Sequence, residues 1–306
     1  MTGGAVPGVS VSLQELLALR KQPGNGRIPR LAQTTITHGS HAVPQRARGI
    51  EFAEVRPYQP GDDARAIDWR QTARRGHPYT RLFQQEHERP LRLLVDMGPS
   101  MRFATRGAYK SVIAARAAAW LAWQAVAVGD RVGGMAWGVA EQQEVRPLGR
   151  HHGTLKLLQQ IARASQSDPV TTVLADVLRS MRPTLRPGTQ VWLLSDFSGL
   201  DAVAEREIMA LSLQAELRLI HIYDIFEKDP LPGCYLLSDD SSTLALDLTS
   251  AEARAAYSAG FLARLEALRR LGRRIGTPLT SLATHDDPAR QLGWMMEASP
   301  PRLASA

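Results

Sequence analysis

The amino-acid sequence predicts an α/β fold: a mostly parallel, Rossmann-like sheet with helices on both faces, preceded by a small N-terminal β subdomain. From residue 90 onward, short apolar runs alternate with longer helical segments, as in repeated strand–helix–strand units. Before residue 90, polar and apolar residues alternate as in half-buried strands. Three apolar runs end in an aspartate, at Asp96, Asp196 and Asp224.

The elements of the main domain follow in a regular order. Residues 109–128 are rich in Ala, Trp and Val and apolar on most faces, so this helix is expected to be largely buried. The other helices are expected at 154–164, 173–181, 203–214 and 251–275. Strands are expected at 91–95, 131–137, 143–148 (paired with the preceding strand as a hairpin), 190–194, 217–223 and 279–283, with a further hairpin across 233–237 and 243–248.

The first third of the chain divides into two parts. Residues 1–45 are rich in Gly, Pro, Ser and Thr and are assigned to a partly irregular N-terminal extension with one amphipathic helix at 13–20. Residues 46–89 are assigned to the β subdomain and are expected to be extended, with a turn at 58–63. We expect segment 51–69 to pack against the main domain. The main domain then covers 90–292, and 293–306 form a C-terminal tail.

Composition limits the classes of function. The 306 residues carry a net charge of +7, and the first 95 residues alone carry +6, which suits an acidic partner or simply a solvated basic surface. A single cysteine, Cys234, excludes an intramolecular disulfide framework and a cysteine-cluster zinc site. No apolar run reaches the roughly 20 residues of a membrane span, and the first residues do not resemble a signal peptide. We therefore expect a cytoplasmic protein.

The aspartates at the strand ends indicate a site. The carboxyl ends of parallel strands lie on one rim of the sheet, and ligands bind outside that rim near the switch in strand order. The loop from Asp96 to Met101 adds Ser100, and Mg²⁺ prefers such oxygen ligands. The structural alternative is that Asp96 and Asp196 cap the helices that follow them.

Several unusual strings carry a family resemblance. They occur in order between about residues 46 and 292 and closely resemble the signature of domain of unknown function family 58, found beside MoxR-type AAA+ ATPases in bacteria. The strings are Arg48-Gly49-Ile50-Glu51-Phe52, Arg56-Pro57-Tyr58-Gln59-Pro60-Gly61-Asp62-Asp63, Ile67-Asp68-Trp69-Arg70, Thr72-Ala73-Arg74, Asp96 to Met101, Gly129-Asp130-Arg131-Val132-Gly133 and Ser195-Asp196-Phe197.

The resemblance implies a von Willebrand factor type A-like domain, which often carries a metal-ion-dependent adhesion site. On this pattern Asp96, Ser100, Thr172 and Asp196 are the implied ligands of Mg²⁺ or another divalent cation. Gly98 departs from the pattern, because it stands where the first serine ligand is expected. The other reading is a degenerate structural remnant that binds no metal.

The signature string between residues 56 and 74 also has two readings. As structure, it is a turn whose aspartates pair with nearby arginines. As function, it is a docking surface. A nucleic-acid groove is disfavoured because acidic residues are interspersed among the rings and guanidinium groups. The residues concerned are Arg56, Tyr58, Asp62, Asp63, Asp68, Trp69, Arg70 and Arg74.

These observations favour a non-enzymatic protein-interaction module. The resemblance implies an adaptor or chaperone partner of a MoxR-type AAA+ ATPase, with other von Willebrand factor A-domain proteins as further partners. The sequence contains no phosphate-binding loop, no dinucleotide fingerprint, no nucleophile elbow and no His-Glu-x-x-His motif. One alternative is a Mg²⁺-dependent hydrolase at the same aspartates, although the sequence nominates no base or nucleophile. The other is nucleic-acid binding through the basic first third.

Overall fold

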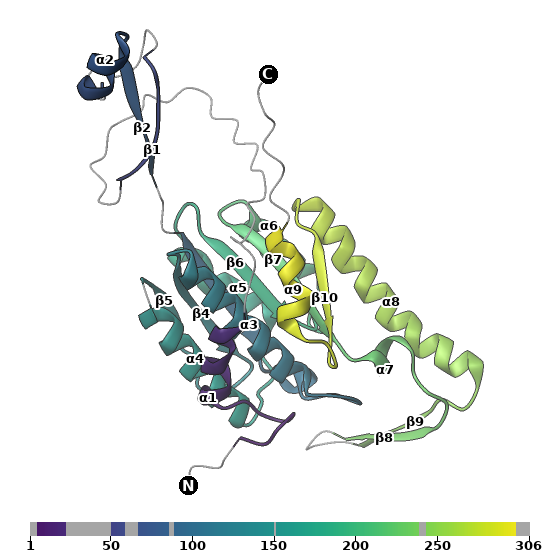
Figure 1. The fold of residues 1–306 in the computed structure, drawn as a ribbon. Helices are drawn as coiled ribbons and strands as arrows, with labels where there is room; N and C mark the ends of the chain where they lie inside the picture. Colours follow the sequence, from purple (N-terminus) through teal and green to yellow (C-terminus); the bar gives the residue numbers. More distant parts are fainter. Residues whose placement is uncertain are drawn as a thin grey trace. The chain divides into compact units, whose positions relative to one another are not determined.

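The computed structural model describes residues 5–22, 50–58, 67–85, 89–149, 151–238 and 243–297. The chain forms two compact units. The main unit contains Met1–Ala32 and Arg89–Ala306, and the smaller unit contains Gln33–Glu88. Figure 1 shows the elements of each unit.

The main unit is built on a six-stranded sheet in the order β10-β7-β6-β3-β4-β5. All neighbouring pairs are parallel except the β4–β5 edge pair, so the predicted mostly parallel sheet and its first hairpin are confirmed. From β3 the chain continues to β4 and β5 at one edge of the sheet, and from β6 it continues to β7 and β10 at the other edge. The direction of strand order therefore reverses between the neighbours β3 and β6. The strands are β3 (Pro90–Asp96), β4 (Arg131–Trp137), β5 (Val145–Leu148), β6 (Gln190–Ser195), β7 (Glu216–Tyr223) and β10 (Leu279–Ala283).

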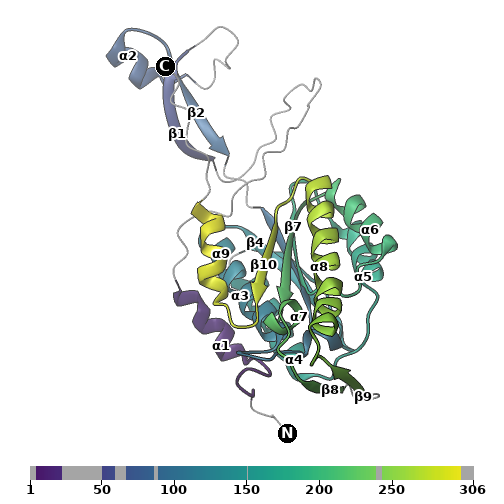
Figure 2. The ribbon, with the colours of Figure 1, turned by 90° about the vertical axis from the view of Figure 1, so that its right-hand side faces the viewer.

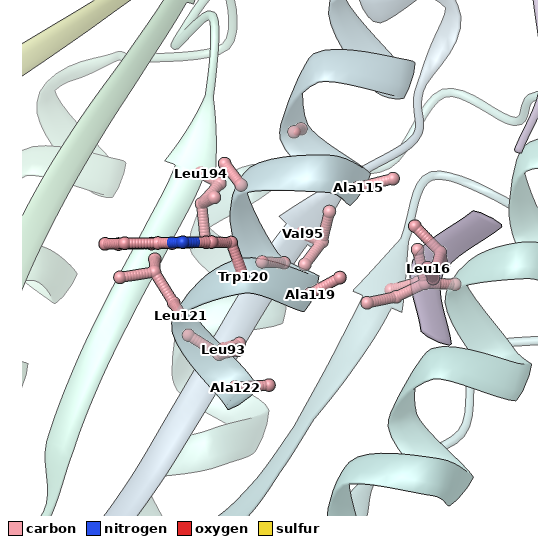
Figure 3. Packing of buried hydrophobic residues seen from close by; sticks show 14 of the residues in the cluster. Leu16, Leu93, Val95, Ala115, Ala119, Trp120, Leu121, Ala122 and Leu194 are labelled. Carbon is pink, nitrogen blue, oxygen red and sulfur yellow. The ribbon is translucent and has the colours of Figure 1, made fainter. Parts of the chain in front are cut away.

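Helices cover both faces of this sheet, as Figure 2 shows. One face carries α1 (Leu13–Ala18), α3 (Lys110–Ala127), α4 (His151–Gln166) and α9 (Pro288–Glu297), and the other carries α5 (Leu174–Met181), α6 (Ala202–Ser212) and α8 (Ala251–Arg274). Side chains alternate between the faces of a strand. Leu93 and Val95 of β3 accordingly enter the first core, whereas Leu94 enters the second. Figure 3 shows the first core around Trp120.

The described part of the N-terminal extension belongs to the main unit. Ser12 caps α1 by accepting a hydrogen bond from the backbone N–H of Glu15, 3.1 Å away. Leu16 is fully buried in the first core, and its carbonyl accepts a hydrogen bond from Nε1 of Trp123 at 3.0 Å. The predicted helix at 13–20 is confirmed, as α1 followed by the 3₁₀ turn η1 (Leu19–Lys21).

Short elements complete the main unit. The turns η3 (Pro99–Met101) and η4 (Arg182–Thr184) follow β3 and α5, and α7 (Ile225–Lys228) follows β7 directly. The predicted second hairpin is confirmed as β8 (Cys234–Ser238) and β9 (Thr243–Asp247). Within the described ranges, none of the helices combines the length and the apolar character needed to cross a bilayer.

The smaller unit contains an antiparallel pair, β1 (Ile50–Pro57) and β2 (Tyr79–Gln85), with a bulge between Phe52 and Glu54. The expectation of extended chain throughout was wrong for α2 (Trp69–Arg75). Asp68 starts this helix by accepting hydrogen bonds from the backbone N–H groups of Arg70 and Gln71, and Gly76, at φ 76°, ends it. Residues 59–66 lie outside the described residues, and the packing of 51–69 on the main domain stays a prediction.

Candidate functional site

The site lies where the sheet changes winding direction. Asp96 is the last residue of β3, Asp196 follows β6, and Asp224 follows β7. These three strands are parallel neighbours, so the predicted rim of aspartates is confirmed. The gap between the ends of β3 and β6 is the position at which open α/β sheets bind ligands.

Asp96 is held by uncharged donors. Its Oδ1 accepts a hydrogen bond from the backbone N–H of Gly98 at 2.9 Å, and its Oδ2 accepts one from the hydroxyl of Ser195 at 2.6 Å. Burial, and then the negative charge of Asp196, raise the pKa of Asp96 to about 7. A carboxyl group with this pKa is partly protonated at neutral pH.

Asp196 is paired with a buried lysine. Its Oδ2 accepts a hydrogen bond from Nζ of Lys110 at 2.7 Å, and its Oδ1 accepts one from the backbone N–H of Ser198 at 2.9 Å. Nζ also donates to Oε1 of Glu227 at 3.1 Å. Burial alone would raise the pKa of Asp196, but the adjacent ammonium group brings it below its ordinary value. Burial likewise opposes the charge of Lys110, yet the two carboxylates raise its pKa.

The remaining predicted ligands line a pocket of about 270 Å³. Asp96, Ser100 and Thr172 all contribute to its wall, and Asp196 does not. The hydroxyl of Ser198 donates to that of Ser100 at 3.0 Å. Oγ1 of Thr172 accepts a hydrogen bond from Nε2 of Gln142 at 3.1 Å. Three of the four predicted residues therefore line one pocket. The fourth, Asp196, is paired with Lys110 and also has a side-chain hydrogen bond with Ser100.

Asp224 has a structural role at the same rim. It is fully buried and accepts hydrogen bonds from the hydroxyls of Thr105, at 2.6 Å, and Thr284, at 2.5 Å. It also caps α7 through the backbone N–H of Phe226. Burial would raise the pKa of Asp224, but these hydrogen bonds, chiefly from Thr105, lower it. Asp224 thus joins the loop before α3 to β10 and α7.

Two backbone features distinguish the loops of the site. Phe197, directly after Asp196, is buried and has φ 53°, a conformation that costs a non-glycine residue about 1–3 kcal/mol and clusters at functional sites. Gly138 has φ 82°, and a Cβ there would lie 2.3 Å from the backbone nitrogen of Gly98. The loop after β4 therefore crosses the loop after β3 at a distance that only glycine allows.

The donor set fits a divalent cation only in part. Asp96, Ser100 and Thr172, which carry carboxyl or hydroxyl oxygens, line the pocket. However, Oδ2 of Asp196 accepts a hydrogen bond from Lys110, and Gly98 supplies no hydroxyl. The four predicted residues do not present a complete set of metal ligands in this arrangement, and divalent-cation binding stays a prediction.

The signature residues of the smaller unit lie in and around α2. Asp68 is buried and caps the helix, whereas Trp69 is 70% exposed. The arginines Arg70, Arg74 and Arg75 of α2 are exposed, and the guanidinium group of Arg75 lies 5.1 Å from the ring centroid of Tyr79. Tyr58 is half-buried, Arg56 lies in β1, and Asp62 and Asp63 fall outside the described residues.

Four residues at the rim were not assigned a role from the sequence. Ser195 was noted only as part of the signature string with Asp196, and Ser198 was overlooked because single serines are common in loops. Lys110 and Glu227 were overlooked because charged residues near helix ends are usually solvated. A lysine at the first position of a helix opposes the helix dipole, and that conflict could have drawn attention to Lys110.

Comparisons with known proteins agree with the resemblance in the sequence. Residues 54–266 match a family model described as "Protein of unknown function DUF58". Uncharacterized proteins from Mycobacterium bovis and Mycobacterium tuberculosis are 32% identical over 268 residues, covering 82% of this chain and 80% of theirs.

Among solved structures, the similar chains include the conserved hypothetical protein BatB from Bacteroides thetaiotaomicron. It has a TM-score of 0.45 and 9% identity, over 68% of this chain and 97% of that chain. A von Willebrand factor type A structure from Catenulispora acidiphila has a TM-score of 0.40 and 14% identity, over 72% of this chain and 43% of that one. The family match and the mycobacterial relatives together show that the chain belongs to the DUF58 family.

Proposed function

We propose that this chain is a non-enzymatic, cytoplasmic protein-interaction module that serves as an adaptor or chaperone partner of a MoxR-type AAA+ ATPase. The pocket at the switch point, lined by Asp96, Ser100 and Thr172, is its docking face. The observation that supports this docking face is the convergence of these polar side chains at the position where α/β sheets bind ligands. The choice of partner rests on the family resemblance alone.

The surroundings of the pocket suit a protein partner. Two apolar side chains beside Thr172 are solvent-exposed, Val170 by 43% and Val173 by 57%. Protein interfaces combine an apolar contact area with a small number of polar groups that fix the register. A pocket of about 270 Å³ is slightly smaller than the size range of small-molecule sites. We propose that it receives one polar side chain of the partner while the valines contact the neighbouring surface.

The test is a binding measurement between the purified chain and a MoxR-type ATPase from the same genome. Thr172→Val and Ser100→Ala each remove a hydroxyl from the pocket wall, and each is expected to weaken binding by at least about tenfold. Leu213→Ala is the control, because Leu213 is 88% exposed between α6 and β7, away from the carboxyl rim. Equal affinity of all three variants for the ATPase would place docking on another surface.

A chelator separates the two forms of docking. If a divalent cation at Asp96, Ser100 and Thr172 bridges to a carboxylate of the partner, EDTA abolishes the complex and Mg²⁺ restores it. If the hydroxyls contact the partner directly, the complex survives EDTA. Both results are compatible with docking through the pocket, and only the first supports a bound metal ion.

We further propose that α2 provides a second contact for an acidic surface of the same partner. The seven residues of this helix include three arginines and no acidic residue, and Trp69 is 70% exposed. Tryptophan and arginine are the side chains most often found at the energetic centre of interfaces. A large exposed ring among cationic groups therefore suits an acidic protein surface.

Trp69→Ala and Arg74→Glu should weaken binding of the ATPase, and the loss from Arg74→Glu should shrink at high salt because exposed charges are screened. His77→Ala is the control, since His77 is also exposed in the smaller unit. A mobility-shift assay with single-stranded DNA tests the nucleic-acid alternative. DNA binding that is lost in Trp69→Ala would assign this surface to nucleic acid instead.

A further inference from the structure

Lys110 occupies a position that is unfavourable for a lysine. It is the first residue of α3, an 18-residue helix, and the N-terminus of a helix carries partial positive charge. Its side chain is also only 2% exposed, and burial of an unpaired ammonium group is costly. Both penalties must be offset by specific partners.

Those partners are two carboxylates from different elements. Nζ lies 2.7 Å from Oδ2 of Asp196, in the loop after β6, and 3.1 Å from Oε1 of Glu227, in α7. The ring of Phe103 covers the ammonium group, with its centroid 5.9 Å from Nζ. The lysine thus joins three separate segments of the rim and carries the positive charge between two acidic side chains.

We propose that the ammonium group of Lys110 is a tethered cation that takes the place of a divalent metal ion at Asp196, so that the rim is assembled without metal. A bound metal ion is often the largest local charge in its site and stabilises the carboxylates around it. Lys110 supplies positive charge to the same carboxylate through a covalently attached group.

The geometry around Gly98 agrees with this replacement. The position that would supply a further hydroxyl ligand is a glycine, and a Cβ there would lie only 3.1 Å from Oδ1 of Asp96. Both oxygens of Asp196 already accept hydrogen bonds, one from Nζ of Lys110 and one from the backbone N–H of Ser198. The rim therefore lacks one hydroxyl ligand and holds an internal cation.

The inference deepens the proposed function and rests on it only for the role of the pocket. Every measurement uses the purified full chain without a partner, so failure of this inference is distinguishable from failure of docking. Thermal unfolding and calorimetric titration with Mn²⁺ are compared for the wild type, Lys110→Met and the double variant Lys110→Met/Asp196→Asn. Lys156→Met is the matched control, because Lys156 is exposed on α4.

The wild type and Lys156→Met are expected to melt at the same temperature in EDTA and in millimolar Mg²⁺, and to show no saturable Mn²⁺ binding. Lys110→Met should lower the melting temperature by on the order of 10 °C in EDTA, because it leaves a buried carboxylate without its partner. Millimolar Mg²⁺ should restore part of this loss. The double variant should regain part of the lost stability without Mg²⁺, because the buried charge of Asp196 is then absent too, and the remaining carboxylate, Glu227, still accepts a hydrogen bond from the backbone N–H of Asp224.

Two results would overturn the inference. One is saturable Mn²⁺ binding by the wild type, since the rim would then hold a metal ion in addition to Lys110. The other is a Lys110→Met variant as stable as the wild type in EDTA. If Lys110→Met does not fold but the double variant does, the charge-balance argument holds. If neither folds, the Mn²⁺ titration of the wild type decides.

Discussion

Nζ of Lys110 lies 2.7 Å from Oδ2 of Asp196, whereas Asp96, on the neighbouring strand, accepts its hydrogen bonds from a backbone N–H and a serine hydroxyl. Two aspartates that look equivalent in the sequence therefore have opposite electrostatic environments. The pKa of Asp96 is raised to about 7, and the pKa of Asp196 is lowered.

The two aspartates should respond differently to the same substitution. Asp96→Asn keeps a group of the same shape, and it removes a charge that burial and Asp196 disfavour, so the free energy of unfolding should stay within about 1 kcal/mol of wild type. Asp196→Asn leaves Lys110 with only Glu227 and should cost on the order of 3 kcal/mol. Urea denaturation at neutral pH measures both. Equal losses would show that the lysine does not distinguish the two sites.

Where the loops after β3 and β4 cross, Gly98 should tolerate substitution better than Gly138. Gly138→Ala places a Cβ 2.3 Å from the backbone nitrogen of Gly98 at φ 82°, so we expect a loss of at least about 3 kcal/mol. Gly98→Ala places its Cβ 3.1 Å from a side-chain oxygen of Asp96, which can shift by a few tenths of an ångström. We expect a loss below about 1.5 kcal/mol. Thermal unfolding compares the two variants, and a lower melting temperature for Gly98→Ala than for Gly138→Ala would contradict this account.

His221 should make the fold sensitive to acid. It is buried in β7, and this burial lowers its pKa from 6.5 to about 4. The positive charges of Arg264, Lys110 and Arg269 also lower the pKa, whereas the negative charge of Asp196 raises it. Nδ1 lies 3.4 Å from the hydroxyl of Ser281, and rings of Phe197, Tyr223 and Phe261 surround the imidazole.

Above pH 6.5 the imidazole is neutral in both the folded and the unfolded state, so it adds no pH dependence. Between pH 6.5 and pH 4 the unfolded chain binds this proton first, so His221 alone should lower the free energy of unfolding by about 3 kcal/mol as the pH drops. Asp96 acts in the opposite direction over this range, because its pKa of about 7 lets the folded chain bind a proton first. His221→Leu removes only the first contribution, so its free energy of unfolding should rise relative to wild type as the pH drops. An unchanged slope in the variant would show that other groups cause the acid sensitivity.

The N-terminal helix should contribute to the stability of the main unit. Leu16→Ala removes a fully buried side chain from the first core and should cost about 2–5 kcal/mol. Gln14→Ala, at an exposed position of the same helix, should change the free energy of unfolding by less than about 0.5 kcal/mol. Chemical denaturation of the full chain compares them. Similar small effects would mean that α1 detaches before the main unit unfolds.

The sheet could be predicted from the sequence because its strands are continuous apolar runs bounded by aspartates and glycines, as in the run from Leu91 to Val95. The rim followed from topology, since parallel neighbours end on the same side. Helix α2 was missed because seven residues give little periodicity, and its boundaries depend on the single cap at Asp68 and on Gly76. Helix α9 was missed for a similar reason, although Leu292 is fully buried.

The pairing of Lys110 could not be predicted, because its partners Asp196 and Glu227 lie 86 and 117 positions away along the chain. Nothing in the local sequence indicates which of several carboxylates a lysine will meet. The same applies to Gly138 and Gly98, whose close approach depends on the crossing of two loops rather than on either loop alone.

The positions of α1, β10 and α9 have a practical consequence. All three belong to the main unit, yet all three lie outside residues 54–266, where the family model matches. A fragment cut at those boundaries would lose Leu16 and Leu292 from the first core, and it would leave β7 as an unpaired sheet edge open to association with other chains. Fragments intended for crystallisation, for NMR or for binding assays should therefore keep both ends of the main unit.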